Sequence, residues 1–262
     1  MRSHSSELFA PRFRGRRLDA VWRNSQLVRN SILGSLSPSD FEHIRPVLQA
    51  VTLKERSVLQ EPNRQVEFVH FFETGLVSLM TLAPGSTLET AMVGSHGFDP
   101  ASIVLGATTS MHRSVVLISA NALRIRADDL HRSIRGRPQI REYLLRYVQP
   151  LMVHCSQTSL CAIHHQHEQR IASWLCLASD AVEGEIFPLT HDHLSMILGC
   201  DRAAVTKVLK RFEQEGLIKK RRGVLRISAR GMLEKKACCC YGIVAGAQRR
   251  VRSLDAITPE IN

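Results

Sequence analysis

The chain has 262 residues, a formal net charge of +11 at pH 7 and 44% hydrophobic residues, so it is long enough for two domains with adequate cores. Its longest apolar run, near residues 76–83, is too short to span a bilayer, and its arginine-containing start lacks the apolar core of a signal peptide. Seven cysteines without a paired framework suit a reducing compartment, so we expect a cytoplasmic protein. The Arg- and Ser-rich start is also compatible with an organellar transit peptide.

The positive charge is concentrated in two segments. Residues 186–236 contain twelve Lys or Arg against five Asp or Glu, and residues 1–30 contain seven Arg against one Glu and one Asp. Because basic groups that meet phosphates release counterions from DNA, this distribution points to double-stranded DNA as a partner. No amphipathic helix with a lipid-binding face accompanies the basic segments, which disfavours a membrane partner.

The first half of the chain predicts a small β domain. We expect residues 1–30 to be a basic, flexible extension and residues 31–130 to form a β-roll. A helix from Pro38 to Gln49, capped by Ser37, precedes the strands. Turns rich in Pro, Gly and Asn separate the short apolar segments that follow. The predicted strands are Val51–Leu53, Val66–Phe72, Leu76–Leu82, Leu88–Val93 and Val115–Ile118.

Residues 131–165 predict a dimerisation helix and hinge. The long helix should open near Pro138, since proline is favoured in a first turn. Pro150 cannot donate a backbone hydrogen bond, so we expect a kink there or a helix start shifted toward it. One stripe runs along the helix, and such a stripe commonly pairs with its twin in a homodimer. It consists of Ile140, Leu144, Tyr147 or Val148, Leu151, Cys155 and Thr158 or Ser159.

Residues 190–214 predict two short amphipathic helices joined by a turn. Thr190 can cap the first helix and Asp201 the second, while Gly199 allows the chain to reverse. The buried faces would contain Leu194, Ile197 and Leu198, followed by Val205, Val208, Leu209 and Phe212. The second helix would present Arg202, Ala203, Thr206, Lys207, Lys210 and Arg211 outward, and these residues together with Thr190 are the predicted DNA contacts of the two helices. This pattern is typical of a helix-turn-helix, whose second helix enters the DNA major groove.

The flanking segments favour DNA binding over an ordinary hairpin with a solvated basic face. Residues 219–227 read as two strands about an Arg222-Gly223 turn, so Arg221 and Arg222 would grip phosphates as part of a wing. A helix from about His167 to Ala181 would supply core residues to a winged domain over residues 166–236. We expect residues 237–262 to form a tail.

The order of β-roll, long helix and winged helix-turn-helix resembles the Crp/Fnr family of bacterial transcription regulators, over about residues 31–241. The motifs that carry the resemblance are Phe72-x-x-Gly75-x-Val77-Ser78, Val93-Gly94 with Gly97, Leu189-Thr190, Leu198-Gly199-Cys200-Asp201-Arg202, Val205-Thr206, Gly216-Leu217-Ile218, Arg221-Arg222-Gly223 and Leu233-Glu234-x-x-Ala237-Cys238-x-Cys240-Tyr241. The resemblance implies an α+β fold with a cyclic-nucleotide-binding-like roll. It also implies a homodimer that binds a pseudo-palindromic promoter site and contacts RNA polymerase.

The same resemblance assigns residues on the second helix. By motif position, Arg202 and Lys207 match two basic positions that contact bases or phosphates in the family. Ala203 departs from the family pattern, which usually has a glutamate that accepts from cytosine N4. We therefore expect a different half-site, with a thymine methyl group against Ala203.

The sensor of this chain should differ from those of the family. The family's roll often binds a cyclic nucleotide through an Arg-Ser pair and a glutamate, and Arg113-Ser114 is the candidate pair here. Residues 90–127 contain no glutamate, so we expect no cyclic nucleotide and an ordinary arginine at 113. The family's oxygen sensors have an N-terminal cysteine cluster, whereas the first cysteine here is Cys155, so no iron–sulfur cluster is expected.

The remaining polar clusters predict no metal site and no enzyme. The side chains at Cys155, Cys161, His164, His165 and His167 have plausible spacing for a metal or haem but lack the spacing of structural zinc sites, so we expect a packing role. Cys200 should be a buried structural cysteine, with regulatory oxidation as the alternative. We expect Cys238–Cys240 to be exposed and without a role. No nucleophile or phosphate loop accompanies His191-Asp192-His193.

These observations predict a homodimeric, sequence-specific transcription regulator whose roll has an unknown or lost ligand. Two alternatives stay open. One is a sequence-nonspecific architectural DNA-binding protein, which the basic extension would support. The other is a small-molecule binding protein or enzyme in which the basic domain is incidental.

Overall fold

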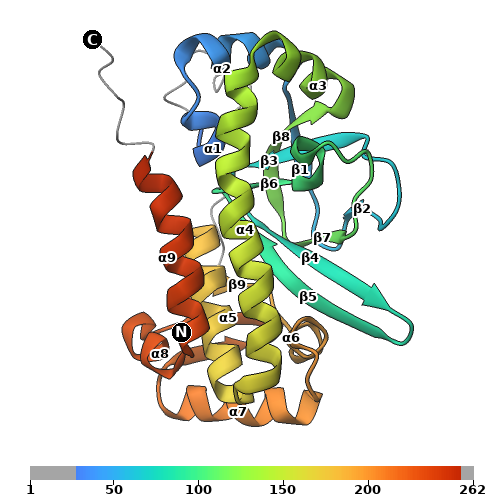
Figure 1. Ribbon diagram of the computed structural model, residues 1–262. Coiled ribbons are helices and arrows are strands. Elements are labelled where there is room, and N and C mark those ends of the chain that lie inside the picture. The colour runs from blue at the N-terminus through green and yellow to red at the C-terminus, as the bar shows by residue number, and fades with distance from the viewer. Residues whose placement is uncertain (1–27, 255–262) are drawn as a thin grey trace, which may run out of the picture.

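The computed structural model describes residues 28–254, with side chains up to residue 250. Most of the predicted basic extension and the end of the predicted tail lie outside the described residues. The fold is α+β, with an N-terminal β-roll, long helices and a C-terminal helix-turn-helix, which confirms the predicted class (Figure 1). None of the helices over residues 28–254 is long and apolar enough to cross a membrane.

Short helices begin the described part of the chain. They are α1 (Ser31–Gly34), α2 (Pro38–Ile44) and the 3-10 helix η4 (Arg45–Val47). Ser37 caps α2 as predicted, since its Oγ accepts from the amide of Asp40 at 3.1 Å. The predicted helix to Gln49 was too long, because Pro46 has no amide hydrogen to continue the α-helical pattern.

Two four-stranded antiparallel sheets form the roll. One has the strand order β1-β8-β3-β6 and the other β2-β7-β4-β5. The strands are β1 (Gln49–Leu53), β2 (Val58–Gln60), β3 (Phe68–Phe72), β4 (Leu76–Ala83), β5 (Ser86–Val93), β6 (Phe98–Asp99), β7 (Arg113–Ile118) and β8 (Ala120–Arg126), with the 3-10 helix η5 (Ala101–Leu105) after β6. All five predicted strands are present, whereas β2, β6 and β8 were not predicted. Buried Phe71, Phe72, Leu79 and Phe98 belong to the core between the sheets.

Two helices follow the roll, α3 (Ala127–Gly136) and α4 (Pro138–His164). The second opens at Pro138, as predicted, and continues through the buried Pro150 as one helix of 27 residues. The predicted shift of the helix start toward Pro150 was wrong. Figure 1 shows that α4 runs the length of the molecule, from the roll to the C-terminal helices.

The predicted dimer stripe on α4 packs inside the protomer. Ile140, Leu144, Tyr147 and Val148 are buried in the core of the roll, and Leu151 and Cys155 pack against that core. The interpretation as a dimer contact was therefore wrong for Ile140, Leu144, Tyr147 and Val148, which are buried in their own chain, whereas Ser159, at the end of the stripe, is exposed.

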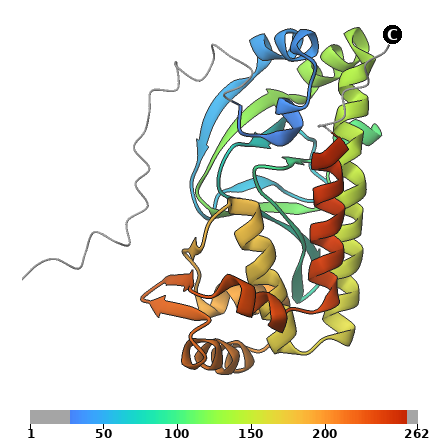
Figure 2. The same ribbon diagram turned by 90° about the vertical axis from the view of Figure 1, so that its left-hand side faces the viewer.

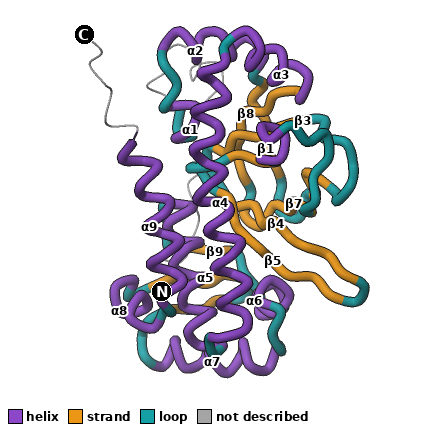
Figure 3. Tube along the Cα trace, viewed as in Figure 1, coloured by secondary structure: helices purple, strands orange, loops and turns teal. Residues whose placement is uncertain are grey.

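The C-terminal half is mainly helical (Figure 3). Its elements are α5 (His167–Val182), β9 (Ile186–Phe187), α6 (His191–Leu198), α7 (Arg202–Gln214), β10 (Ile218–Arg221), β11 (Val224–Ile227), α8 (Arg230–Lys236) and α9 (Cys239–Leu254). Much of the predicted tail is thus the helix α9, which lies alongside α4 (Figures 1 and 2). Its Val244 and Ala245 are buried in the core of the C-terminal half.

The C-terminal half packs against strand β5 of the roll. The indole Nε1 of Trp174, on α5, donates to Glu89 Oε1 at 2.6 Å, and Ser78 Oγ donates to the other carboxylate oxygen. Glu89 is buried, and this burial raises its pKa to about 7 despite the two hydrogen bonds, which lower it. A Cβ at Gly94 would collide with the carbonyl of Ala181, so glycine is needed where the two parts meet.

Replacing Glu89 by Gln should change how stability depends on pH. The pKa of Glu89 rises from an ordinary 4.5 to about 7 on folding, so between these values the native state binds more protons than the unfolded state. The contribution of Glu89 to the free energy of unfolding should therefore fall by about 3 kcal/mol between pH 4.5 and pH 8. The contributions of His70 and His154, whose pKa values burial lowers to about 4, should rise over the same range. Urea unfolding at pH 4.5 and pH 8 should show a change in the free energy of unfolding that is about 3 kcal/mol more negative for the wild type than for Glu89→Gln.

The comparison of the two proteins removes the effect of the other titrating groups, such as Asp99. Burial also raises its pKa, to about 6, but its contribution is the same in both proteins and disappears from the difference. If the free energy of unfolding depended on pH equally in the wild type and in Glu89→Gln, this would contradict a buried carboxyl group with a raised pKa at this position.

Candidate nucleic-acid interface

The helix-turn-helix forms with the predicted caps. Thr190 Oγ1 accepts from the amide of His193 at 3.2 Å, and Asp201 Oδ2 accepts from the amide of Ala204 at 3.3 Å. Gly199 has φ +57°, the left-handed conformation that favours glycine, and it ends α6. The buried residues on the two helices are Leu194, Ile197, Leu198, Val205, Leu209 and Phe212. The predicted helix boundaries and core are therefore confirmed, except that Val208 is only half-buried.

The predicted outward face of α7 is exposed. It consists of Arg202, Ala203, Thr206, Lys207, Lys210 and Arg211. The helix α7 lies at the lower end of the molecule in Figure 1, at the opposite end from α2 and α3. A helix that presents one basic, exposed face and buries the other has the form needed to enter the major groove.

The first turn of α6 holds two polar side chains of α7. Arg202 Nε pairs with Asp192 Oδ1 at 2.7 Å, and Thr206 Oγ1 forms a hydrogen bond with His191 Nδ1 at 2.9 Å. Partial burial, followed by the charges of Lys220 and Arg202, lowers the pKa of His191. Both Arg202 and Asp192 are about two-thirds exposed, so the ion pair is weak enough for a DNA group to replace Asp192.

Arg211 differs from the other basic residues of α7. Its guanidinium pairs with Glu168 at 2.9 Å and with Glu215 at 3.0 Å, and Lys236 pairs with both glutamates. This network joins α5, α7 and α8. The sequence did not predict these ion pairs of Arg211, and its predicted contact with DNA stays a prediction.

A basic wing follows α7, as predicted. Strands β10 and β11 pair antiparallel with Arg221 opposite Val224, and Gly223 has φ +74° at the turn. Arg221 and Arg222 are exposed at this turn. The strand β9, which was not predicted, pairs with β11 and completes a three-stranded sheet. Figure 2 shows the hairpin projecting beside α7.

The candidate nucleotide-binding pair of the roll is occupied by acidic side chains of the same protein. Arg113 Nη2 pairs with Glu61 at 3.2 Å, and buried Ser114 donates through Oγ to Asp99 Oδ2 at 2.5 Å. An anionic ligand would have to replace Glu61 and approach the carboxyl group of Asp99. The arrangement therefore disfavours phosphate binding at this pair.

The predicted histidine-cysteine cluster is rearranged. Cys161 and His165 lie together with Cys238 and Cys240, whereas Cys155, His164 and His167 do not take part. The prediction of an exposed cysteine tail was wrong for Cys238 and Cys240, which are buried, and right for Cys239, which is exposed. The sequence did not reveal this group because 72 residues lie between its two halves, which end at His165 and begin at Cys238.

Cys200 is half-buried at the turn between α6 and α7. Burial raises the pKa of its thiol, so the thiolate needed for oxidation is scarce near neutral pH. This environment favours a structural cysteine over a regulatory one.

Comparison with known proteins identifies the C-terminal domain. Residues 169–236 match the family model of the Crp-like helix-turn-helix domain. This part of the chain is therefore similar to Crp-like helix-turn-helix domains. The predicted resemblance to the Crp/Fnr family is thus confirmed at the domain that carries the candidate DNA-binding face. No curated protein sequence matches the chain significantly.

Solved structures extend the likeness to the whole fold. A Crp/Fnr-family regulator from Eubacterium rectale aligns with a TM-score of 0.61 at 15% identity, covering 78% of this chain and 96% of the other. CLP of Xanthomonas campestris, a c-di-GMP-responsive global regulator, aligns with a TM-score of 0.60 at 15% identity, covering 73% of this chain and 99% of the other. FixK2 of Bradyrhizobium japonicum aligns with a TM-score of 0.59 at 15% identity, covering 73% of this chain and 98% of the other. The chain therefore has the fold of Crp/Fnr-type transcription regulators.

The arginines of the wing should affect how DNA affinity depends on salt concentration. If Arg221 and Arg222 each contact a DNA phosphate, the double variant Arg221→Ala, Arg222→Ala should reduce the slope of log affinity against log salt by about 1.8. Fluorescence anisotropy with a labelled duplex at several salt concentrations measures this slope. The matched control is Arg64→Ala, Arg135→Ala, which removes two exposed arginines from outside the C-terminal domain. Equal slopes for the two double variants would contradict a phosphate-binding wing.

Proposed function

We propose that this protein is a sequence-specific transcription regulator that binds a pseudo-palindromic promoter site as a homodimer in the cytoplasm. The observation that carries the proposal is the exposed basic face of α7 within a domain that matches the Crp-like helix-turn-helix family. Its regulatory output would come from contact with RNA polymerase at the promoter. The roll would serve as a sensor for a ligand other than a cyclic nucleotide, or would have lost its ligand.

Sequence recognition would depend on the first turns of α7. On binding, Arg202 would exchange Asp192 for a guanine, whose O6 and N7 accept two hydrogen bonds from a guanidinium. Exposed Ala203 offers only a methyl group, which suits the methyl group of thymine. Exposed Lys207 would contact phosphates or nearby base edges, and exposed Lys210 would contact phosphates.

Selection from random duplex DNA tests this recognition. The ligand-free wild type should enrich a two-fold symmetric motif, Arg202→Ala should lose preference at one position in each half-site, and Ala203→Glu should shift a neighbouring position toward C·G. Lys210→Ala is the control, because loss of a phosphate contact should weaken binding to all sequences alike. An unenriched wild-type pool, in the presence and absence of cell extract, would instead favour a nonspecific architectural protein.

The homodimer would use the outward face of α4. Met152, Leu160 and Ile163 are large apolar residues on this helix with exposed fractions of 65%, 43% and 79%. Met152 and Ile163 are eleven residues apart, close to three helical turns, so they lie on one face of α4. Exposed apolar side chains aligned on a helix favour pairing with a second copy.

A charge placed in this stripe should separate the two copies. We expect Ile163→Glu to shift the protein from dimer to monomer in sedimentation velocity, because the carboxylate would be desolvated at the contact. Leu105→Glu is the matched control, since Leu105 is 58% exposed and lies in the roll. A monomeric wild type, or a dimer that survives Ile163→Glu, would contradict this interface.

A further inference from the structure

A compact group of metal-ligating side chains lies where α4 meets α9. Cys161 and His165 are at the end of α4, Cys238 directly precedes α9, and Cys240 is in its first turn. Each of the four offers one sulfur or nitrogen atom, and these atoms all lie within 4.8 Å of one another. Two segments that are far apart in the sequence thus bring three thiols and an imidazole to one point.

The distances within the group match the geometry of a tetrahedral ion. Cys161 Sγ lies 3.5 Å from Cys238 Sγ, and Cys240 Sγ lies 3.6 Å from His165 Nδ1. A tetrahedral zinc ion with ordinary bond lengths separates two sulfur ligands by about 3.8 Å and a sulfur from a nitrogen by about 3.6 Å. Small side-chain adjustments would therefore place all four ligands around one ion.

The surrounding structure fixes the four side chains in place. Ser173 of α5 accepts from the amide of Cys238 at 3.0 Å, and its Oγ lies 3.1 Å from Cys238 Sγ. The amide of His165 donates to the carbonyl of Cys161 at 3.1 Å at the end of α4. Metal sites in proteins commonly have such hydrogen bonds to their ligands, and these bonds orient the ligands before the metal binds.

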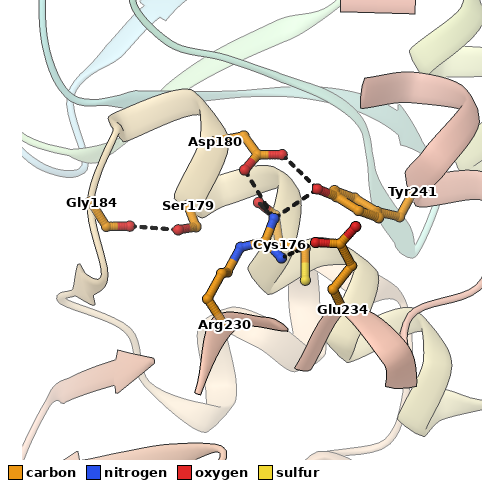
Figure 4. A network of polar contacts seen from close by, with 7 residues as sticks. All are labelled: Cys176, Ser179, Asp180, Gly184, Arg230, Glu234 and Tyr241. Atoms are coloured by element: carbon orange, nitrogen blue, oxygen red, sulfur yellow. Dashed lines mark hydrogen bonds and ion pairs between the residues drawn. The ribbon is translucent and has the colours of Figure 1, made fainter. Parts of the chain in front are cut away.

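A second network anchors the start of α9 beside the group. Arg230 donates to Asp180 at 2.9 Å and to the hydroxyl of Tyr241 at 2.7 Å, and this hydroxyl donates to Asp180 at 3.0 Å. Figure 4 shows Arg230 between Asp180 of α5 and Tyr241 of α9, with Glu234 of α8 on the other side. Because Tyr241 directly follows Cys240, this network holds the tail cysteines against α5.

The set of donors selects the metal. Three thiolates and an imidazole form the Cys3His set of closed structural zinc sites, in which no ligand position is left for a substrate. The exposed fractions of Cys161, Cys238 and Cys240 are 9%, 5% and 4%, so the protein shields the site from solvent. Arg170, which lines the same cavity as Cys161 and Cys240, would balance the net negative charge of three thiolates and one divalent ion.

We propose that Cys161, His165, Cys238 and Cys240 form a structural zinc site that joins the end of α4 to the start of α9. Zinc would fix the connection between α4 and α5, because His165 belongs to this connection and Ser173 of α5 contacts a ligand. The site is independent of the proposed DNA recognition, since none of its residues lies on α7 or the wing.

Elemental analysis of the full chain, purified without chelators or a metal-affinity column, tests the proposal. We expect one zinc ion per chain in the wild type and almost none in Cys161→Ser or Cys238→Ser. Cys239→Ser is the matched control and should keep the zinc, because Cys239 is exposed and its Sγ lies 3.8 Å from the other ring nitrogen of His165. Zinc retained by Cys238→Ser or lost from Cys239→Ser would overturn this set of ligands.

A rescue variant separates ligand loss from misfolding. His165→Ala should lose zinc, whereas His165→Cys should keep it, because four thiolates also form a structural zinc site. Cobalt exchanged into the wild type should give the intense visible absorption of tetrahedral cobalt with thiolate ligands.

Two results would contradict a zinc site, one with the cysteines reduced and one with them oxidised. A folded wild type with seven free thiols and no zinc or cobalt binding would overturn the proposal. So would a Cys161–Cys238 disulfide, seen as a loss of two hydrogen masses under denaturing, non-reducing conditions from protein purified under reducing conditions.

Discussion

The packing of α4 against the roll determines where the rest of the molecule lies. The ring of Tyr147 lies 5.0 Å from that of Phe98, and a Cβ at Gly97 would approach the Tyr147 ring to 2.5 Å. Such close contact leaves little freedom to slide or rotate the helix. Because α5 begins three residues after α4 ends, the position of α4 also determines where the DNA-binding domain starts.

The DNA-binding domain is held against the roll by a few contacts that combine polar and apolar groups. Trp174 donates to Glu89, the amide of Ser95 donates to the carbonyl of Ala181 at 3.4 Å, and Leu88 packs close to Gly199. A rotation of the C-terminal half as one unit relative to the roll would separate these pairs. A carboxyl group whose pKa burial raises to about 7 makes this contact sensitive to protonation near neutral pH.

The sequence predicted local structure well where caps and periodicity agree. Thr190, Gly199 and Asp201 mark the ends of α6 and α7, and the apolar residues between them recur at helical spacing, so both helices were found. The strands β2 and β6 were missed because three- and two-residue strands contain too little alternation to recognise. Glycines at 242 and 246 weaken the helical signal of α9, although Tyr241, Val244 and Ala245 have helical spacing.

The sequence did not show which segment each buried or charged surface contacts in the folded protein. The stripe through Leu144 indicates that one face of α4 is buried, and the same pattern would arise against a second copy or against the chain's own roll. The pairing of Arg211 with Glu168 and the meeting of Cys161 with Cys238 also depend on contacts between distant segments. Periodicity and spacing report local geometry, so such contacts become visible only in the folded chain.

In the proposed complex, two copies of the protein present α7 to successive major grooves of one DNA site. Hydroxyl-radical footprinting of the protein on a duplex recovered by selection tests it most directly. A homodimer should give two protected regions related by two-fold symmetry, with centres about one helical turn apart. A single protected region, or uniform protection without a centre of symmetry, would contradict it.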